Sequence, residues 1–355
     1  MAYSTINDPS AYFQTKTYTG TGSSNAITND GNSDLQPDWI WGKATTQTYN
    51  HNVFDTSRGL TKRLTIDQSD AENTDSTTIT AVGSDGFTLG TSANLNGSSV
   101  NYVAWQWKAN GGTTSSNTDG TITSTVQANT TAGFSIITYS GNGSNNATVG
   151  HGLGATPKMI ITKNRSAAYN WIVYHPTLAA TKILVLDMDL AEFTPSGGYY
   201  SNVGSSTYQL VQGSSNLTNV NANGNDYVAY CFAEKQGYSK FGNYTGNGSS
   251  DGPFVYTGFK TAFVMVKNIS SAAPWRIYSQ EISNHATPFN DLDETIFPDT
   301  NAAATDTSHP FDFTSNGFKV RGSNVDVNTD GDQYIYMAFA AQSLVGTNNV
   351  IALAR

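Results

Sequence analysis

Residues 244–249 read Tyr-Thr-Gly-Asn-Gly-Ser, and this short pattern decides how the chain is organised because it occurs three times. The earlier occurrences are Tyr-Thr-Gly-Thr-Gly-Ser at 18–23 and Tyr-Ser-Gly-Asn-Gly-Ser at 139–144. Gly and Asn in such clusters are typical of tight turns between extended segments. A motif that recurs at long intervals within one chain indicates duplicated units.

Two further anchors follow each copy in the same order. An apolar run that ends in lysine comes first, at 39–43, 159–163 and 263–267. An aromatic run then closes each copy, at 101–105, 226–230 and 333–337. The opening and closing tyrosines, Tyr18 and Tyr102, Tyr139 and Tyr227, and Tyr244 and Tyr334, are 84, 88 and 90 residues apart. Three anchors at nearly constant spacing predict three copies of one unit.

The first two copies also match between their anchors. Asp67 and Glu72 of the first copy recur as Asp187 and Glu192 of the second, at a common offset of 120 residues. The third copy has an acid-rich stretch, 291–299, in this region instead. We therefore expect the third copy to have diverged most from the shared pattern.

The composition predicts strands rather than helices. Tyr, Thr, Val and Phe favour strands, Gly and Asn favour turns, and no sustained helical period is present. Charged residues make up 13% of the chain, about half the usual share of roughly 25%. We predict an all-β fold of three tandem β-sandwich, jelly-roll-like domains that arise from the internal repeat.

The anchors also set the expected boundaries. We predict an N-terminal arm at 1–16, unit 1 at 17–110, linker strands and unit 2 at 111–236, unit 3 at 237–341 and a C-terminal tail at 342–355. Residues 110–118, rich in Gly, Ser and Thr, are expected to form a flexible linker. Apolar residues in the tail predict that one or both chain ends dock onto another subunit or another protein. The alternative is that the tail folds back on unit 3.

Charge and cysteine content exclude several classes of protein. The net charge is −9 and no run of Lys or Arg exists, so nucleic acid and an anionic membrane surface are poor partners. No apolar stretch approaches the roughly 20 residues that span a bilayer, and the N-terminus does not resemble a secretory signal. One cysteine excludes an internal disulfide framework and a multi-thiolate metal site.

Two kinds of glycine-rich segment could be mistaken for ligand-binding loops. Residues 326–331 match the first half of an EF-hand loop, but Met337 stands where a bidentate Glu is needed. The Gly-x-Gly-Ser triplets lack the following helix and the lysine of a phosphate loop. Both segments are predicted to be turns between strands.

The candidate catalytic side chains are better explained as structural groups. The histidines, none in a metal-ligand spacing, are His51, His151, His175, His285 and His309. Cys231 lies inside a predicted closing strand, where a packed thiol is expected. Carboxylate pairs occur at Asp67 and Asp70, Asp187 and Asp189, and Asp291 and Asp293, but sequence does not show the spacing that glycoside hydrolysis requires. We assign no catalytic, cofactor-binding or metal-binding residue and expect no cofactor.

The strand-end lysines and the aromatic residues are expected to serve the fold. Lys43, Lys163 and Lys267 are predicted to snorkel at a strand end or to pair with a carboxylate of the same unit. One member each of the pairs Trp39/Trp41 and Trp105/Trp107 is expected to be a main core anchor. Their counterparts in the other units are Tyr230, Phe232, Met337 and Phe339.

Several longer segments resemble a family of virion structural proteins of tailed phages, especially marine phages of cyanobacteria and similar hosts. The segments are MAYSTINDPSAYFQTKTYTG, LQPDWIWGK, HNVFDTSRGLTK, SDGFTLG, NYVAWQWKA, NTDGTITSTVQANTTAGFSI and LVGTNNVIALAR. In addition, VGHGLGATPKMIITK is similar to a segment of phage tail proteins. The resemblance covers nearly the whole chain and implies a virion component rather than a reaction.

This resemblance sets the functional expectation. We expect a non-enzymatic virion structural protein, synthesised in the host cytoplasm and assembled into a tail fibre or host-attachment appendage. Capsid decoration without receptor binding is the alternative, and a polysaccharide depolymerase is a minor alternative. The expected partners are other virion proteins, further copies of the chain, and a host cell-surface glycan or protein, with no nucleic acid and no membrane.

Overall fold

The computed structural model describes residues 4–179, 181–195, 199–211, 219–282 and 291–343. Within these ranges the helical elements are the 3-10 turn η1 (Pro9–Ala11) and the single turn α1 (Ala93–Asn96), and the other elements are strands. The expected all-β fold is therefore confirmed. No helix in the described ranges is long and apolar enough to cross a membrane.

Unit 1 contains a six-stranded sheet and a three-stranded sheet. The strands are β1 (Phe13–Thr19), β2 (Asn25–Thr28), β3 (Trp39–Ala44), β4 (Asn52–Asp55), β5 (Lys62–Thr65), β6 (Asn73–Thr74), β7 (Ile79–Gly83), β8 (Gly86–Leu89) and β9 (Asn101–Trp107). The larger sheet has the order β1-β9-β3-β4-β5-β6, and the smaller has the order β2-β8-β7.

Unit 2 contains a seven-stranded sheet and a three-stranded sheet. The strands are β10 (Ser115–Asn117), β11 (Ser124–Asn129), β12 (Phe134–Ser140), β13 (Ala147–Gly150), β14 (Met159–Asn164), β15 (Ile172–Tyr174), β16 (Leu184–Val185), β17 (Tyr200–Ser201), β18 (Thr207–Leu210) and β19 (Asp226–Phe232). The orders are β10-β11-β12-β19-β14-β15-β16 and β13-β18-β17.

Unit 3 contains two four-stranded sheets. The strands are β20 (Ser239–Thr245), β21 (Phe254–Tyr256), β22 (Phe259–Asn268), β23 (Arg276–Ser279), β24 (Asp291–Thr295), β25 (Thr305–Thr314), β26 (Gly317–Val320) and β27 (Gln333–Ser343). The orders are β20-β27-β22-β23 and β21-β26-β25-β24.

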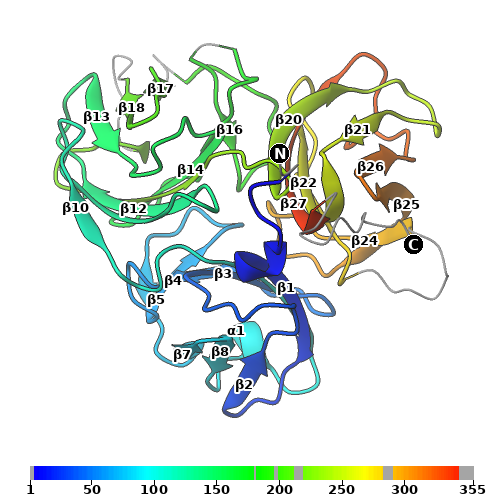
Figure 1. Cartoon of the computed structure of the whole chain (residues 1–355), viewed down its shortest axis with the longest axis horizontal. Helices are drawn as coiled ribbons and strands as arrows, with labels where there is room; N and C mark the ends of the chain where they lie inside the picture. The colour runs from blue at the N-terminus through cyan, green and yellow to red at the C-terminus, as the bar shows by residue number, and fades with distance from the viewer. Residues whose placement is uncertain (1–3, 180, 196–198, 212–218, 283–290, 344–355) are drawn as a thin grey trace.

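The main sheets of the three units share one strand order. The closing strand lies between the opening strand and the lysine-ended strand, as in β1-β9-β3, β12-β19-β14 and β20-β27-β22. The opening tyrosine faces the closing tyrosine across each antiparallel ladder, in the pairs Tyr18 and Tyr102, Tyr139 and Tyr227, and Tyr244 and Tyr334. The sequence anchors therefore occupy corresponding strands, and Figure 1 shows the units as three lobes around a common centre.

Each lobe buries a core of its own between its sheets. Ile40, Phe87 and Tyr102 belong to such a core in unit 1, and separate clusters fill unit 2 and unit 3. A fourth cluster draws on the other face of all three main sheets and lies where the units meet. The chain thus has three peripheral cores and one shared central core.

The central core corrects the expectation about the tryptophans. Trp39, Trp41, Trp105 and Trp107 are all fully buried and all belong to the central cluster. Residues two apart in a strand point to the same face, so both members of each pair face the centre. Their counterparts in units 2 and 3 lie in the same cluster, as expected.

Two rings of hydrogen bonds join the units around this core. In the first, a ring nitrogen eight residues after the strand-end lysine donates to a carbonyl of another unit: Trp171 Nε1 to Thr65 O (2.8 Å), Trp275 Nε1 to Val185 O (2.8 Å) and His51 Nε2 to Phe297 O (2.9 Å). These bonds run from unit 2 to unit 1, from unit 3 to unit 2 and from unit 1 to unit 3. The set therefore closes on itself.

The second ring uses backbone groups at matching positions. The bonds are Glu72 N to Arg165 O (2.9 Å), Glu192 N to Ile269 O (3.1 Å) and Ala304 N to Thr45 O (2.8 Å). A head-to-tail contact that repeats and closes produces a ring. Units 1, 2 and 3 therefore form one closed ring with approximate threefold symmetry.

The five predicted domain ranges stay predictions. At both chain ends and in the linker, however, the structure differs locally from what was expected. Residues 13–16 of the expected arm belong to β1, and Ile6 lies in the central core. The expected flexible linker contributes β10 to a sheet, and the Asp38 carboxylate accepts the N–H groups of Gly111 and Gly112 at 2.9 and 2.8 Å. Gln342 and Ser343 of the expected tail belong to β27. The rest of the tail lies outside the described residues.

Candidate functional site

The Gly-x-Gly-Ser loops are turns held by buried asparagines. In unit 2, Asn221 Oδ1 accepts the N–H of Asn142 at 2.9 Å and its Nδ2 donates to Ser144 O at 2.9 Å. Asn96 and Asn328 make the matching bonds in units 1 and 3. Each loop joins two strands, as predicted. In each loop a backbone N–H group donates to the side-chain oxygen of the buried asparagine.

The segment 326–331 contributes one of these asparagines rather than a metal loop. Asn328 is fully buried and clamps the loop at 246–249, while Asp326 forms an ion pair with Arg276. Among the described residues, no group of three or more His, Cys, Asp or Glu side chains is arranged to hold a metal ion. The Asp326 carboxylate therefore has a structural partner.

The strand-end lysines are fully buried, so they do not snorkel to solvent. Lys43 Nζ donates to Ala44 O at 2.7 Å, and Lys267 Nζ donates to Ala273 O at 2.7 Å. Lys163 Nζ donates to Ser69 O of unit 1 at 2.9 Å. Burial lowers the pKa of each lysine to about 8, and neighbouring carboxylates oppose this shift. The lysines therefore hold strand ends and unit junctions through backbone carbonyls.

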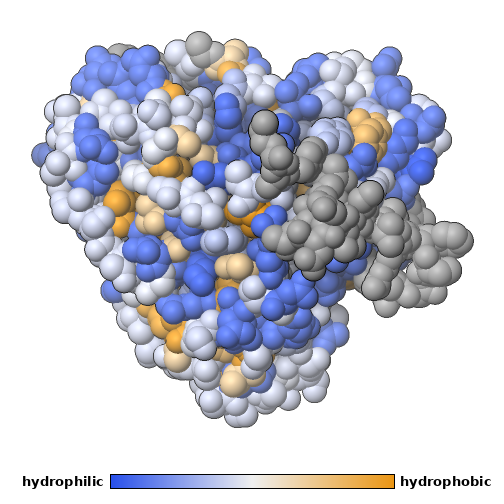
Figure 2. Space-filling model, viewed as in Figure 1, coloured by the Kyte–Doolittle hydropathy of each residue, from blue (hydrophilic) through white to orange (hydrophobic). Residues whose placement is uncertain are grey.

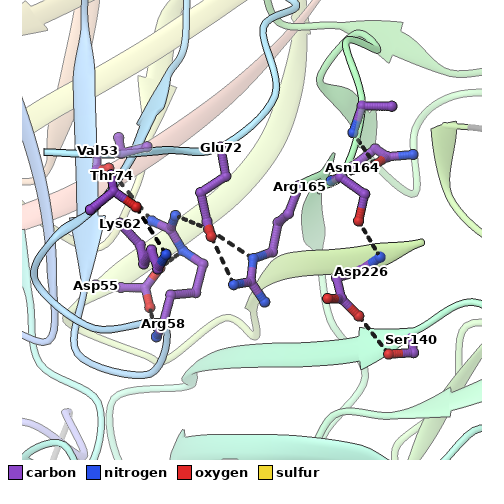
Figure 3. Close-up of polar contacts among 12 residues, drawn as sticks. Val53, Asp55, Arg58, Lys62, Glu72, Thr74, Ser140, Asn164, Arg165 and Asp226 are labelled. Atoms are coloured by element: carbon purple, nitrogen blue, oxygen red, sulfur yellow. Dashed lines mark hydrogen bonds and ion pairs between the residues drawn. The ribbon is translucent and has the colours of Figure 1, made fainter. Parts of the chain in front are cut away.

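A buried charge network joins unit 1 to unit 2. Arg58, whose side chain has no exposed surface, binds Asp55 at 2.5 Å and Glu72 at 2.8 Å. Arg165 of unit 2 binds the same Glu72 carboxylate through two nitrogens, at 2.8 and 2.9 Å. Figure 3 shows the two arginines pointing toward Glu72 from opposite sides. Tyr230 completes the network by donating to Asp55 at 2.8 Å.

The electrostatics of this network favour its ionised form. Burial alone would raise the pKa of Glu72, but hydrogen bonds and charge from Arg165 and Arg58 outweigh it and lower the pKa. Burial raises the pKa of Tyr230 well above its ordinary value. The network therefore fixes the junction between the two units, and its tyrosine stays neutral.

A groove of about 440 Å³ opens on unit 2 next to Arg165. Its lining is dominated by hydroxyl and amide side chains: Thr121, Thr123, Thr125, Thr138, Ser140 and Asn142. Asp226 lies at its edge and accepts a hydrogen bond from Ser140 Oγ at 2.6 Å (Figure 3). Such a surface offers both donors and acceptors to a polyhydroxylated ligand.

A second groove, of about 760 Å³, lies at the matching position between unit 1 and unit 3. Tyr18, Thr45 and Asn101 occupy the places that Tyr139, Arg165 and Asp226 occupy in the first groove. Glu281 and Glu294 of unit 3 also line this groove. Burial and then Asp293 and Asp306 raise the pKa of Glu294.

The described histidines are buried and hydrogen-bonded. His51 Nδ1 accepts from Trp41 Nε1 at 2.9 Å, so its Nε2 carries the hydrogen that is donated to Phe297 O. Burial lowers the pKa of His51 and His151, and it lowers that of His175 to about 3. His285 lies outside the described residues, and the side chain of His309 is likewise not described. The three described histidines are therefore neutral structural groups near pH 7.

Cys231 and one member of each of the first two carboxylate pairs also have structural surroundings. Cys231 is fully buried in β19, and burial raises its thiol pKa well above the ordinary value. Asp67 Oδ1 accepts the N–H of His51 at 2.8 Å, and Asp187 Oδ1 accepts the N–H of Trp171 at 2.9 Å. The side chain of Asp291 is not described.

Sequence reasoning missed the Asp55, Arg58, Glu72 and Arg165 network. Arg165 follows the strand-end lysine of unit 2 by two residues, where unit 1 has Thr45 and unit 3 has Ile269. That difference between repeats is a signal, because a charged residue at one of three matching positions indicates a contact specific to one junction. This difference between the repeats does not show that Glu72 of unit 1 is the residue that Arg165 binds.

The comparison with protein-family models assigns residues 8–343 to the family described as Domain of unknown function (DUF7483). The match covers nearly the whole chain, so the chain belongs to this family. Neither the curated proteins nor the solved structures compared with the chain contain a match.

Proposed function

We propose that this chain is a non-enzymatic structural protein of a tailed-phage virion and forms part of a tail fibre or host-attachment appendage. Its proposed place is the tail or particle surface, after synthesis in the host cytoplasm. The proposal begins from the resemblance of its terminal and internal segments to virion structural proteins. The contacts of the described residues add support for a binding scaffold.

The observation that carries the proposal is a contrast between the charged side chains of the interior and the polar side chains of the grooves. Buried charged groups such as Arg58 and Lys163 are tied to carboxylates or carbonyls that fix the fold. The groove of unit 2 instead presents exposed hydroxyls on a strand that is itself anchored in a seven-stranded sheet. Rigid elements that present polar groups outward suit recognition of a ligand.

The surface has the character expected of a protein that binds polar ligands. Figure 2 shows a face dominated by hydrophilic and intermediate residues, with small scattered hydrophobic patches. Large apolar patches generally mark surfaces that pair through hydrophobic burial. The hydroxyl-lined grooves therefore favour a host cell-surface glycan over an apolar surface as the receptor. The expected assembly partners are other virion proteins and further copies of the chain.

The test has a location step and a binding step. Antibodies against the chain are used to label intact particles in electron micrographs, and we expect label on the tail or its appendages. Recombinant protein is then added to host cells and should compete with particle adsorption. Label confined to the head together with no competition would support capsid decoration instead, and release of reducing sugar from host polysaccharide would support a depolymerase.

A groove-filling variant connects binding to the site. Thr125 is exposed on β11 within the groove of unit 2, and Thr125→Trp should weaken adsorption competition at least about tenfold by occupying the groove. Thr80→Trp, at an exposed position of β7 away from the groove, is the matched control and should compete as the unmodified protein does. Equal competition by both variants would remove this groove from the proposal.

A further inference from the structure

The outer face of the second sheet of unit 3, β21-β26-β25-β24, carries two exposed aromatic side chains. Phe254 and Tyr256 of β21 are 49% and 50% exposed, the highest fractions among the large hydrophobic side chains of the described residues. Val255, which lies between them, is buried in the core of unit 3. Because side chains alternate along a strand, Phe254 and Tyr256 point together away from that core, with their Cα atoms roughly 7 Å apart. Figure 2 shows a small hydrophobic patch in the part of unit 3 where Figure 1 places β21.

The neighbouring strands define what surrounds the two rings. Residues directly opposite each other in an antiparallel pair point to the same face of the sheet. Lys319 lies opposite Phe254, and Gly317 lies opposite Tyr256. Gly317 has no side chain, so no side chain of β26 stands directly between Tyr256 and β25. The strand partners of the aromatic pair on this face are Lys319 and Gly317 of β26, followed by Asp312 and Thr314 of β25.

Two ion pairs border the aromatic pair. Lys319 Nζ lies 2.7 Å from Asp251 Oδ1, and Arg321 Nε lies 2.6 Å from Asp312 Oδ2. The side chains of Asp251 and Arg321 are 84% and 46% exposed, so solvent or a ligand can also reach them. A carboxylate accepts hydrogen bonds, and ammonium and guanidinium groups donate them. The face therefore combines an apolar surface with hydrogen-bonding groups at its border.

The aromatic pair is specific to unit 3. The matching strands are β2 of unit 1 and β13 of unit 2, because each follows a Gly-x-Gly-Ser loop and pairs its central buried residue with an aromatic residue. At the positions of the aromatic pair, β2 has Ala26 and Thr28, and β13 has Thr148 and Gly150. The shared fold thus forms without aromatic side chains here, so their presence in unit 3 needs a reason other than folding.

The exposed area of the two rings limits the size of the partner. Aromatic side chains bury roughly 150–250 Å² each when fully covered, so two half-exposed rings offer about 150–250 Å² together. A stable protein–protein interface takes about 800 Å² from each partner. The aromatic pair is therefore too small to hold a folded protein by itself, and it matches a small ligand or one segment of a polymer.

The chemistry of this face fits a pyranose sugar. One side of a pyranose ring presents C–H groups that pack on an aromatic ring, whereas its hydroxyl groups exchange hydrogen bonds with carboxylate and ammonium groups. Asp251 and Lys319 place such groups beside Phe254. A lipid chain or an apolar peptide would instead cover these charges without hydrogen-bonding to them, which costs free energy. The surroundings of the rings therefore favour a sugar over an apolar partner.

We infer that Phe254 and Tyr256 form a sugar-binding face on unit 3, with a pyranose ring packed on the aromatic pair and its hydroxyl groups bound by Asp251 and Lys319. The inference rests on the proposed attachment function, since it names a second contact for the same host glycan. The groove of unit 2 supplies the first contact and lies on another lobe of the ring. Two contacts with one polysaccharide strengthen binding beyond either contact alone when the polysaccharide spans both.

A fluorescent reporter on the full chain tests whether a sugar covers this face. All six native tryptophans are fully buried, so Phe254→Trp adds one exposed indole whose quenching by acrylamide can be followed separately. The probes are the methyl glycosides of glucose, galactose and N-acetylglucosamine, and polysaccharide extracted from host cells. We expect at least one of them to reduce the quenching and to shift the emission to shorter wavelength. Unchanged quenching with every probe would overturn the sugar-binding face.

Binding of variants to immobilised host polysaccharide measures what the rings contribute. The double variant Phe254→Ala with Tyr256→Ala should bind at least about tenfold more weakly, because it removes both packing surfaces. Phe193→Ala is the matched control, since Phe193 is a 37% exposed aromatic side chain of unit 2 outside this face, and it should bind as the unmodified protein does. The double variant should keep the melting temperature of the unmodified protein, because substitutions of exposed side chains change stability little.

The outcomes separate this inference from the proposed function. Equal polysaccharide binding by the double variant and the unmodified protein would overturn the sugar-binding face and leave the attachment role standing. Label confined to the head and no adsorption competition would overturn the attachment role, whereas protection of the introduced tryptophan by a sugar would still support the face. A concentration-dependent dimer that the double variant loses would assign the face to a second copy of the chain and overturn the sugar inference.

Discussion

Replacing Trp39 by alanine should destabilise unit 2 as well as unit 1, although Trp39 belongs to unit 1. Its ring is fully buried and stacks on Tyr230 of unit 2 with a centroid separation of 4.4 Å. Phe134 and Phe232, also of unit 2, lie at 5.8 and 5.9 Å. The side chain is therefore a direct packing link between the two units.

The expected loss follows from the volume removed. Truncating a buried aromatic side chain to alanine costs roughly 3–5 kcal/mol, and each favourable ring pair adds about 0.5–1.5 kcal/mol beyond its buried area. Trp39→Phe should cost less, because the indole N–H of Trp39 has no hydrogen-bond partner among the described groups and a ring remains. Phe254→Ala, at a half-exposed position of β21, should change stability by under about 1 kcal/mol.

The assay is urea unfolding of the three variants, with hydrogen exchange to locate the effect. We expect Trp39→Ala to lower the free energy of unfolding by roughly 3–5 kcal/mol and to speed exchange in β12 and β19 of unit 2. A loss below about 1 kcal/mol, or a loss that leaves the unit 2 strands unchanged, would refute the assignment of Trp39 to a shared core.

Three further predictions follow from the polar contacts. Unfolding free energy should rise with pH between about 8 and 10, because unfolded lysines keep their protons to about 10.5 whereas Lys43, Lys163 and Lys267 release theirs near 8. Lys267→Met should reduce that slope by up to about 1.4 kcal/mol per pH unit in urea titrations, and an unchanged slope would contradict the burial of this lysine. Asn328→Ala should cost roughly 2–4 kcal/mol because the loop at 246–249 loses its buried partners, whereas the exposed Asn223→Ala should cost under about 0.5 kcal/mol. Glu72→Gln and Arg165→Gln should show a coupling energy of about 1–3 kcal/mol in a double-mutant cycle, and additive losses would argue against the bidentate pair.

The repeated anchors predicted much of the fold, because each anchor occupies the same strand position in every unit. The opening and closing tyrosines pair across one ladder in every unit, so their constant spacing reported a real strand order. The Gly-x-Gly-Ser motif was correctly predicted to be a turn, because Gly and Asn favour turns locally. The sequence did not show that a buried asparagine holds this turn, since Asn221 lies 79 residues from Asn142.

The contacts between units could not be predicted, since they depend on how finished units pack. The side chains of Trp39 and Trp41 both pack in the central core. The two-residue period of a strand places them on one face of the sheet, but the sequence does not show that this second face is buried as well. Composition was misleading at 110–118, where Gly and Ser suggested flexibility. The Asp38 carboxylate fixes that backbone, and nothing near Asp38 in the sequence indicates this partner. Arg165 likewise meets Glu72 only because units 1 and 2 pack against each other.

Calorimetry of the intact chain tests most directly the central claim that three units form one closed ring around a shared core. If the units unfold together, the calorimetric and van't Hoff enthalpies should agree, with a ratio of about 1. Hydrogen exchange in β9, β19 and β27 should then report one common opening free energy. An enthalpy ratio near about 3, with separate opening free energies for the three strands, would show independent domains and contradict the shared core.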